Sequence, residues 1–109
     1  MKKEIINNTL SIMIDGMEIR TKEQLLTTMK EAFSFPDYFG MNWDALDEVL
    51  KDLSWLKRVQ SIQITFENSS QILSSATEND RLFFRDIMNV TASYWKDDDC
   101  RNFIVAFND

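Results

Sequence analysis

Three stretches of the chain carry the hydrophobic pattern of β-strands. Residues 10–15 are apolar and rich in β-branched side chains, and residues 61–66 alternate strictly between apolar and polar positions, as a half-buried strand does. Residues 102–107 form a continuous apolar run, which is typical of a central strand buried on both faces. Ile5 and Ile6 predict a further short edge strand near the N-terminus.

Two longer stretches repeat their apolar residues at the spacing of amphipathic helices. The first, residues 21–33, starts at Thr21, a candidate N-cap that Glu23 and Gln24 follow as capping-box partners. Its apolar stripe consists of Leu25, Leu26, Met29, Ala32 and Phe33. The second, residues 77–95, starts at Thr77. Its predicted stripe consists of Leu82, Phe83, Ile87, Val90 and Tyr94. A charged turn at residues 96–99 is expected to follow.

A third helix is expected within residues 35–53, after a tight turn. Pro36 prevents any helix from running through this point, and we expect Gly40 to supply the positive φ angle that a sharp turn requires. Asn42 is the candidate N-cap of the helix that follows. One face of this helix is apolar and consists of Leu46, Val49, Leu50 and Leu53.

The opposite face of the same helix is acidic. Asp44, Glu48 and Asp52 follow one another at four-residue spacing, Asp47 lies beside them, and Lys51 is the nearby base. Like charges four residues apart destabilise an isolated helix by about 0.2–0.5 kcal/mol per pair. A helix with a purely structural role would therefore favour alternating charges. A solvated surface and a binding surface both remain possible explanations of this face.

The negative charge of the protein is concentrated in this segment. The chain of 109 residues has a net charge of −6. Residues 37–52 contain five acids and one base, a net charge of −4, which leaves −2 for the rest of the chain. Phosphate binding requires clustered Lys and Arg, so nucleic acid is not expected as a direct ligand. A localised acidic patch favours a basic protein partner.

The composition lacks the groups that most enzymes use. The chain contains no histidine, no glycine-rich phosphate loop and no Cys/His cluster, so we expect no enzyme activity, no cofactor and no metal. Asp97, Asp98 and Asp99 could hold a hard cation, but solvated charges in a turn explain them more simply. Cys100 is the only cysteine. No internal disulfide can form, which suits a reducing compartment.

The organisation of the chain is simple. With 109 residues it is long enough for one hydrophobic core, and no linker or internal repeat divides it, so we expect a single domain over residues 1–109. The N-terminal stretch lacks the long apolar region of a secretory signal, and no run approaches membrane-spanning length. We therefore expect a cytoplasmic protein without membrane contact.

The acidic segment also resembles a known motif. Residues 38–50, YFGMNWDALDEVL, are similar to the Tyr-x-Gly-x-Asn-x-Asp-Ala-Leu motif of the barstar family of ribonuclease inhibitors. Upstream, residues 14–16 and 19–20 resemble the first strand and turn of that family at the same distance from the motif, with no gap. The resemblance covers residues 12–50 well and the remainder by the order of its elements, while residues 1–9 lie outside it.

The resemblance implies a fold and a function. The fold is a small α/β domain, a three-stranded parallel sheet packed by helices, which agrees with the order of the predicted elements. The function is that of an inhibitor or immunity protein, which blocks the basic active site of a ribonuclease-type toxin through the acidic helix and the preceding loop. Tyr38 and Asp44 match contact positions of the family. Glu48 falls where the family prototype carries its dominant aspartate, and Asp47 falls where the prototype has a tryptophan.

We expect a monomer that forms a one-to-one complex with a basic ribonuclease or nuclease-like toxin. The predicted partner-binding residues are Tyr38, Gly40, Asn42, Trp43, Asp44, Asp47, Glu48 and Asp52. For Trp43, packing at the edge of the core is the alternative to partner contact. Asp86 is the only acid between residues 81 and 95, and we assign it no role. The alternative function is a non-inhibitory interaction or regulatory module on the same fold.

Overall fold

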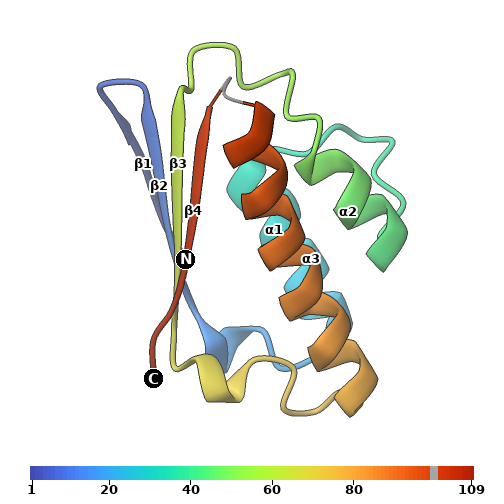
Figure 1. Ribbon diagram of the computed structural model, residues 1–109. Helices are drawn as coiled ribbons and strands as arrows, with labels where there is room; N and C mark the ends of the chain where they lie inside the picture. The colour runs from blue at the N-terminus through green and yellow to red at the C-terminus, as the bar shows by residue number, and fades with distance from the viewer. Residues whose placement is uncertain (99–100) are drawn as a thin grey trace.

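The computed structural model describes residues 1–98 and 101–109. A single sheet with the strand order β1-β2-β3-β4 forms one layer of the protein (Figure 1). The strands are β1 (Lys2–Ile6), β2 (Thr9–Asp15), β3 (Ser61–Glu67) and β4 (Asn102–Phe107). Strands β2, β3 and β4 are parallel, as predicted, and β1 pairs with β2 in the antiparallel sense. The sheet therefore has one strand more than the three that the resemblance implied, and this strand, β1, confirms the edge strand predicted at Ile5 and Ile6.

Three α-helices form the second layer and lie on the same face of the sheet (Figure 1). They are α1 (Lys22–Phe33), α2 (Trp43–Leu50) and α3 (Glu78–Asp98). Two short 3₁₀ helices, η1 (Gly16–Glu18) and η2 (Ser69–Gln71), follow β2 and β3. Among the described residues, no helix combines the length and the hydropathy needed to cross a membrane.

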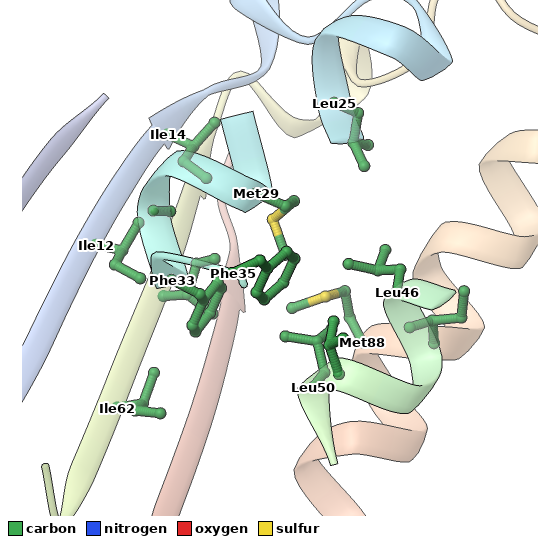
Figure 2. Close-up of a cluster of buried hydrophobic side chains, with 14 of the residues drawn as sticks. Ile12, Ile14, Leu25, Met29, Phe33, Phe35, Leu46, Leu50, Ile62 and Met88 are labelled. Atoms are coloured by element: carbon green, nitrogen blue, oxygen red, sulfur yellow. The ribbon is translucent and has the colours of Figure 1, made fainter. Parts of the chain in front are cut away.

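The core lies between the sheet and the helices (Figure 2). Alternate residues of β2 and β3 face the helices and are buried, which for β3 confirms the half-buried strand predicted from the strict alternation of residues 61–66. Helix α1 buries all five residues of its predicted stripe. Its N-cap is Thr21, which forms a reciprocal capping box with Gln24. Local sequence signals therefore identify these elements correctly.

The prediction for β4 is wrong in its position. β4 lies at an edge of the sheet, and β3, which pairs with strands on both sides, occupies the centre with β2. Phe103 is buried, while the side chain of Ile104 is 55% exposed on the face without helices. A continuous apolar run does not distinguish a strand covered on both faces from an edge strand that leaves apolar side chains exposed.

The stripe predicted for α3 is also wrong. Of its five residues only Ile87 is buried, and Leu82, Phe83, Val90 and Tyr94 are exposed. The residues that α3 buries are Phe84, Ile87, Met88, Thr91 and Trp95. Two apolar stripes lie side by side on this helix, and their spacing alone cannot tell which one faces the sheet.

The end of α3 differs from the prediction as well. The helix continues to Asp98, so Lys96 and Asp97 are helical and do not belong to a turn. Asp99, part of the candidate cation cluster, and Cys100 lie outside the described residues.

Helix α2 and the loops around it are tied to the other helices by the three tryptophans. The indole N–H of Trp43, the first residue of α2, donates to Asp80 near the start of α3 at 2.9 Å. The indole of Trp95 on α3 donates at 2.8 Å to the carbonyl of Leu50, the last residue of α2. Both ends of α2 are therefore attached to α3.

The third tryptophan, Trp55, lies beyond α2 and donates at 2.8 Å to the carbonyl of Phe33, the last residue of α1. Trp55 and Leu56 are partly buried and pack against the core. Together the three bonds connect both ends of α2 and the connection to β3 with the rest of the helical layer.

We expect Trp95→Phe to destabilise the protein more than Trp43→Phe. The bond from Trp95 is buried, so its loss leaves the Leu50 carbonyl without a partner, at a cost of about 1–3 kcal/mol. The bond between Trp43 and Asp80 is only partly buried, so the Asp80 carboxylate can exchange it for water. Urea denaturation of both variants measures the difference. Equal loss of stability in the two would show that the indole bonds do not differ in this way.

Candidate functional site

The loop before α2 presents one aromatic side chain to solvent between two that anchor it. Phe35 and Phe39 are both buried and their rings lie 4.8 Å apart, centroid to centroid. Phe35 also contacts Phe33 at the end of α1. Tyr38 lies between them in sequence and is 72% exposed. Phe39 therefore fills the core, while Tyr38, which the resemblance implies as a contact position, is exposed to solvent.

The sharp turn into α2 uses a different residue from the one expected. Gly40 does not have a positive φ angle; the left-handed residue is Met41, with φ of 51°. A side chain on Gly40 would instead crowd the Asn42 amide, which donates to the Gly40 carbonyl at 3.2 Å. Glycine at this position therefore permits a close approach, and the turn itself is made one residue later.

Helix α2 begins as predicted and ends earlier. The Asn42 side chain accepts from the Ala45 amide at 2.8 Å and caps the helix. Leu46, Val49 and Leu50 are buried, and the helix ends at Leu50. Leu53 is also buried, but it lies beyond the helix with φ of 50°.

Asp52 accordingly lies outside α2, in the turn after it. Its carboxylate accepts from the amide of Ser54 at 3.3 Å. Glu48 and Asp52 therefore do not form the helical like-charge pair that their spacing suggests. The helical acids are Asp44, Asp47 and Glu48.

Helix α2 forms a ridge with a groove on each side, and the predicted site residues divide equally between the two. The groove between α2 and α3, which we call the α3-side groove, has a volume of about 450 Å³. The predicted residues that line it are Asn42, Trp43, Asp44 and Asp47. The loop-side groove has a volume of about 330 Å³. The predicted residues that line it are Tyr38, Gly40, Glu48 and Asp52.

The acids on the ridge differ in their electrostatic partners. Lys51 lies 3.1 Å from Asp47, at the i,i+4 position, and neutralises it. Asp44 and Glu48 are exposed, and within the described part of the chain no basic side chain lies within ion-pair distance of either. These two carboxylates therefore form the uncompensated part of the acidic face.

Trp43 forms one rim of the α3-side groove. It is half-buried and packs against the core near Phe84, as the boundary-packing alternative predicted. The ammonium group of Lys22 lies over its ring, 5.2 Å from the centroid. The hydrogen bond from Trp43 is the main cause that lowers the pKa of Asp80, and the charge of Lys22 contributes.

Sequence reasoning assigned no role to Asp86, which the structure places in the same groove. It is exposed on α3 and lines the α3-side groove together with Asp44 and Asp47 of α2. The only sequence signal was its isolation as an acid in this part of α3. Which side of α3 faces α2 could not be read from the sequence, because the phase of the helix was ambiguous.

The α2 ridge does not offer a metal site. In residues 1–98 and 101–109, no group of three His, Cys, Asp or Glu side chains is arranged to hold a metal ion. The acids project from a convex helix rather than into an enclosed cavity. The arrangement is therefore suited to contact with a complementary surface.

We expect Trp43→Phe to raise the pKa of Asp80 toward its ordinary value of about 3.9. In the parent, Asp80 has a lower pKa in the folded protein than in the unfolded chain. This difference stabilises the fold at any pH above the unfolded-state pKa, and the stabilisation is lost as the pH falls through the folded-state pKa. The variant should therefore lose less stability on acidification. Carboxyl NMR titration measures the pKa directly.

Asp109 is the internal control for this titration. Hydrogen bonds from Ser69 and the Ser70 amide are the main causes that lower its pKa, and Trp43 does not contribute. Its pKa should be unchanged in Trp43→Phe. A rise at both carboxyls would indicate a general loosening of the fold.

The resemblance noted in the sequence extends over nearly the whole chain. The family model described as Barstar (barnase inhibitor) matches residues 9–108. The match begins at the first residue of β2 and leaves only β1 and its turn outside at the N-terminal side. It therefore includes the three parallel strands, all three helices and every residue of the α2 ridge. On this match, the chain belongs to the Barstar (barnase inhibitor) family.

Proposed function

We propose that this protein is an inhibitor, or immunity protein, that binds and blocks the basic active site of a ribonuclease-type toxin. The observation that carries the proposal is the α2 ridge, on which Asp44 and Glu48 are exposed and, among the described residues, have no basic side chain within ion-pair distance. Membership of a family described by its inhibition of barnase supports the same conclusion.

The carboxylates of the ridge imitate the phosphates of the RNA substrate. A ribonuclease holds those phosphates with Lys and Arg side chains in its active site. Asp44 and Glu48, one helical turn apart, present two negative charges to the same cations. When the ridge occupies the active site, the substrate is excluded without any chemical step on the inhibitor.

The ridge is held in place before the partner arrives. Helix α2 is capped by Asn42 and attached at both ends to α3 through Trp43 and Trp95. Little conformational entropy is therefore lost on binding, which favours affinity. The repulsion between neighbouring acids is tolerated because buried side chains, such as Leu46 and Leu50, stabilise the helix.

Tyr38 adds an aromatic contact beside the acids. It lines the loop-side groove with Glu48, and buried neighbours on either side hold its backbone. Exposed tyrosines with a fixed backbone are common among residues that dominate binding energy. We infer a one-to-one complex in which Tyr38 contacts the toxin next to the cation that Glu48 binds.

We place this complex in the cytoplasm, where a ribonuclease toxin would reach cellular RNA. The inhibitor itself would not bind nucleic acid, because its exposed acids repel phosphate. The direct test uses the product of the reading frame beside the gene for this protein, which we propose to be the toxin. Purified inhibitor should slow its RNA cleavage at a molar ratio of one. Capture of the toxin without any slowing would instead support a non-inhibitory binding module.

We expect Asp44→Ala and Glu48→Ala to weaken toxin binding while leaving stability nearly unchanged. Each variant leaves a desolvated cation of the toxin unpaired, which costs about 2–5 kcal/mol in complexes with buried charge pairs, barnase–barstar being a worked case. Removal of a like-charge neighbour should change the free energy of unfolding by no more than about 0.5 kcal/mol. Calorimetric titration and urea denaturation measure the two effects.

Two control variants make the comparison specific. Glu31→Ala removes an exposed acid from α1, away from both grooves, and should leave binding unaltered. Leu50→Ala removes a fully buried side chain and should cost about 2–5 kcal/mol of stability. If the two ridge variants bound the toxin as tightly as Glu31→Ala, the acidic face would be solvated surface only.

We also expect the association rate to fall as the ionic strength rises. The localised negative charge attracts a basic partner over distances that salt screens, with a Debye length of about 10 Å at 0.1 M. Stopped-flow measurements at low and high salt test this. The charge-removing variant Glu48→Gln should show a shallower salt dependence than the parent, and a rate insensitive to salt in both would exclude electrostatic steering.

A further inference from the structure

We propose that the toxin inserts an apolar side chain, with cationic residues on either side of it, into the α3-side groove. The binding surface of this protein would then have an apolar half on α3 beside the acidic half on α2. This inference rests on the proposed function and adds the chemistry of the partner's contact. Its evidence is the apolar stripe of α3 that the core does not use.

The stripe is formed by Phe83 and Val90. Their side chains are 56% and 40% exposed, and they are separated by seven residues, which places them on one face of α3. Both line the α3-side groove, and the buried Ile87 lies between them. The core is complete without them, because α3 packs against the sheet through a different set of residues. Packing of the fold therefore does not explain these apolar side chains.

Carboxylates flank this apolar wall. Asp86 lies on α3 between Phe83 and Val90, and Asp44 lies across the groove on α2. The lysines at the groove have partners within the protein: Lys22 lies over the ring of Trp43, and Lys51 pairs with Asp47. The charges that remain available to a partner are the carboxylates of Asp44 and Asp86, which lie on the two sides of the apolar surface.

This pattern selects a partner of matching chemistry. An apolar side chain, aromatic or aliphatic, fits against Phe83 and Val90, and neighbouring Lys or Arg residues meet Asp44 and Asp86. A second copy of this chain fits poorly, because each copy has a net charge of −6 and would bring acids against the acidic rims. A cationic toxin offers the required charge, and the groove is continuous with the ridge that it is proposed to bind.

The apolar half should act on the dissociation rate alone. Loss of a ridge charge should change the association rate and its salt dependence, and also the dissociation rate where the charge pair is buried, whereas burial of apolar surface mainly slows dissociation. Phe83→Ser should therefore raise the dissociation rate of the toxin about tenfold, with the association rate and its salt dependence unchanged. Val90→Ser should act in the same direction with a smaller effect, because it removes less apolar surface.

Leu82→Ser is the matched control. Leu82 neighbours Phe83 on α3 and is 61% exposed, but it does not line the groove. The complex of the Leu82→Ser variant with the toxin should dissociate at the same rate as the complex of the parent. Because Leu82, Phe83 and Val90 are all exposed, the three variants should fold and melt like the parent, so a change in dissociation can be read as a contact effect.

A second measurement needs no toxin. The capped peptides Lys-Trp-Lys and Lys-Gly-Lys are titrated separately into the labelled protein and followed by NMR. The tryptophan peptide should shift the signals of Phe83, Val90 and the Trp43 indole, and these shifts should disappear in Phe83→Ser but persist in Leu82→Ser. Equal shifts with both peptides, or none at Phe83 and Val90, would overturn the proposal.

The outcomes separate this inference from the proposed function. If Asp44→Ala weakens toxin binding while Phe83→Ser dissociates like Leu82→Ser, the function stands and the apolar half is refuted. If the tryptophan peptide binds as expected but the toxin is not inhibited, the groove chemistry stands and the proposed inhibition fails. A parent dimer that Phe83→Ser converts to a monomer would assign the face to a second copy and overturn the proposal.

Discussion

The attachment of α2 to the rest of the helical layer is the constraint on which the candidate site depends. The helix has only eight residues, too few to be stable in isolation. Its buried leucines hold one face, and hydrogen bonds from Trp43 and Trp95 fix its two ends against α3. A short helix held in this way can carry repelling charges on its outer face, because its stability comes from tertiary packing rather than from its own sequence.

Two arginines contribute to the stability of the loops around the helical layer. Arg81 donates to the carbonyls of Leu73 and Ala76, and Arg101 donates to those of Leu53 and Leu56. These guanidinium groups satisfy backbone acceptors in the loops. Both loops are therefore held in place by charge-assisted hydrogen bonds as well as by apolar packing.

Much of the fold could be predicted from sequence because its signals are local. The alternation of residues 61–66, the capping box of α1 and the cap at Asn42 depend on neighbours within a few positions. The errors concern features that distant contacts decide. The edge position of β4 depends on the order of strands in the sheet, and the left-handed turn residue, Met41 rather than Gly40, depends on how the loop packs. The eight predicted site residues do lie on one ridge and its loop, but their division between two grooves required the position of α3.

The error in the phase of α3 has a physical cause that bears on function. A helix that packs on one side needs one apolar stripe, and helix periodicity detects any stripe without indicating what it contacts. The sequence of α3 contains two, and the core uses the one that includes Phe84 and Met88. The stripe that includes Phe83 and Val90 stays exposed beside the acids of α2. Exposed apolar surface rimmed by polar residues often marks an interaction site. The position of this stripe beside Asp44 and Asp86 is the reason for proposing a basic partner with an apolar protrusion.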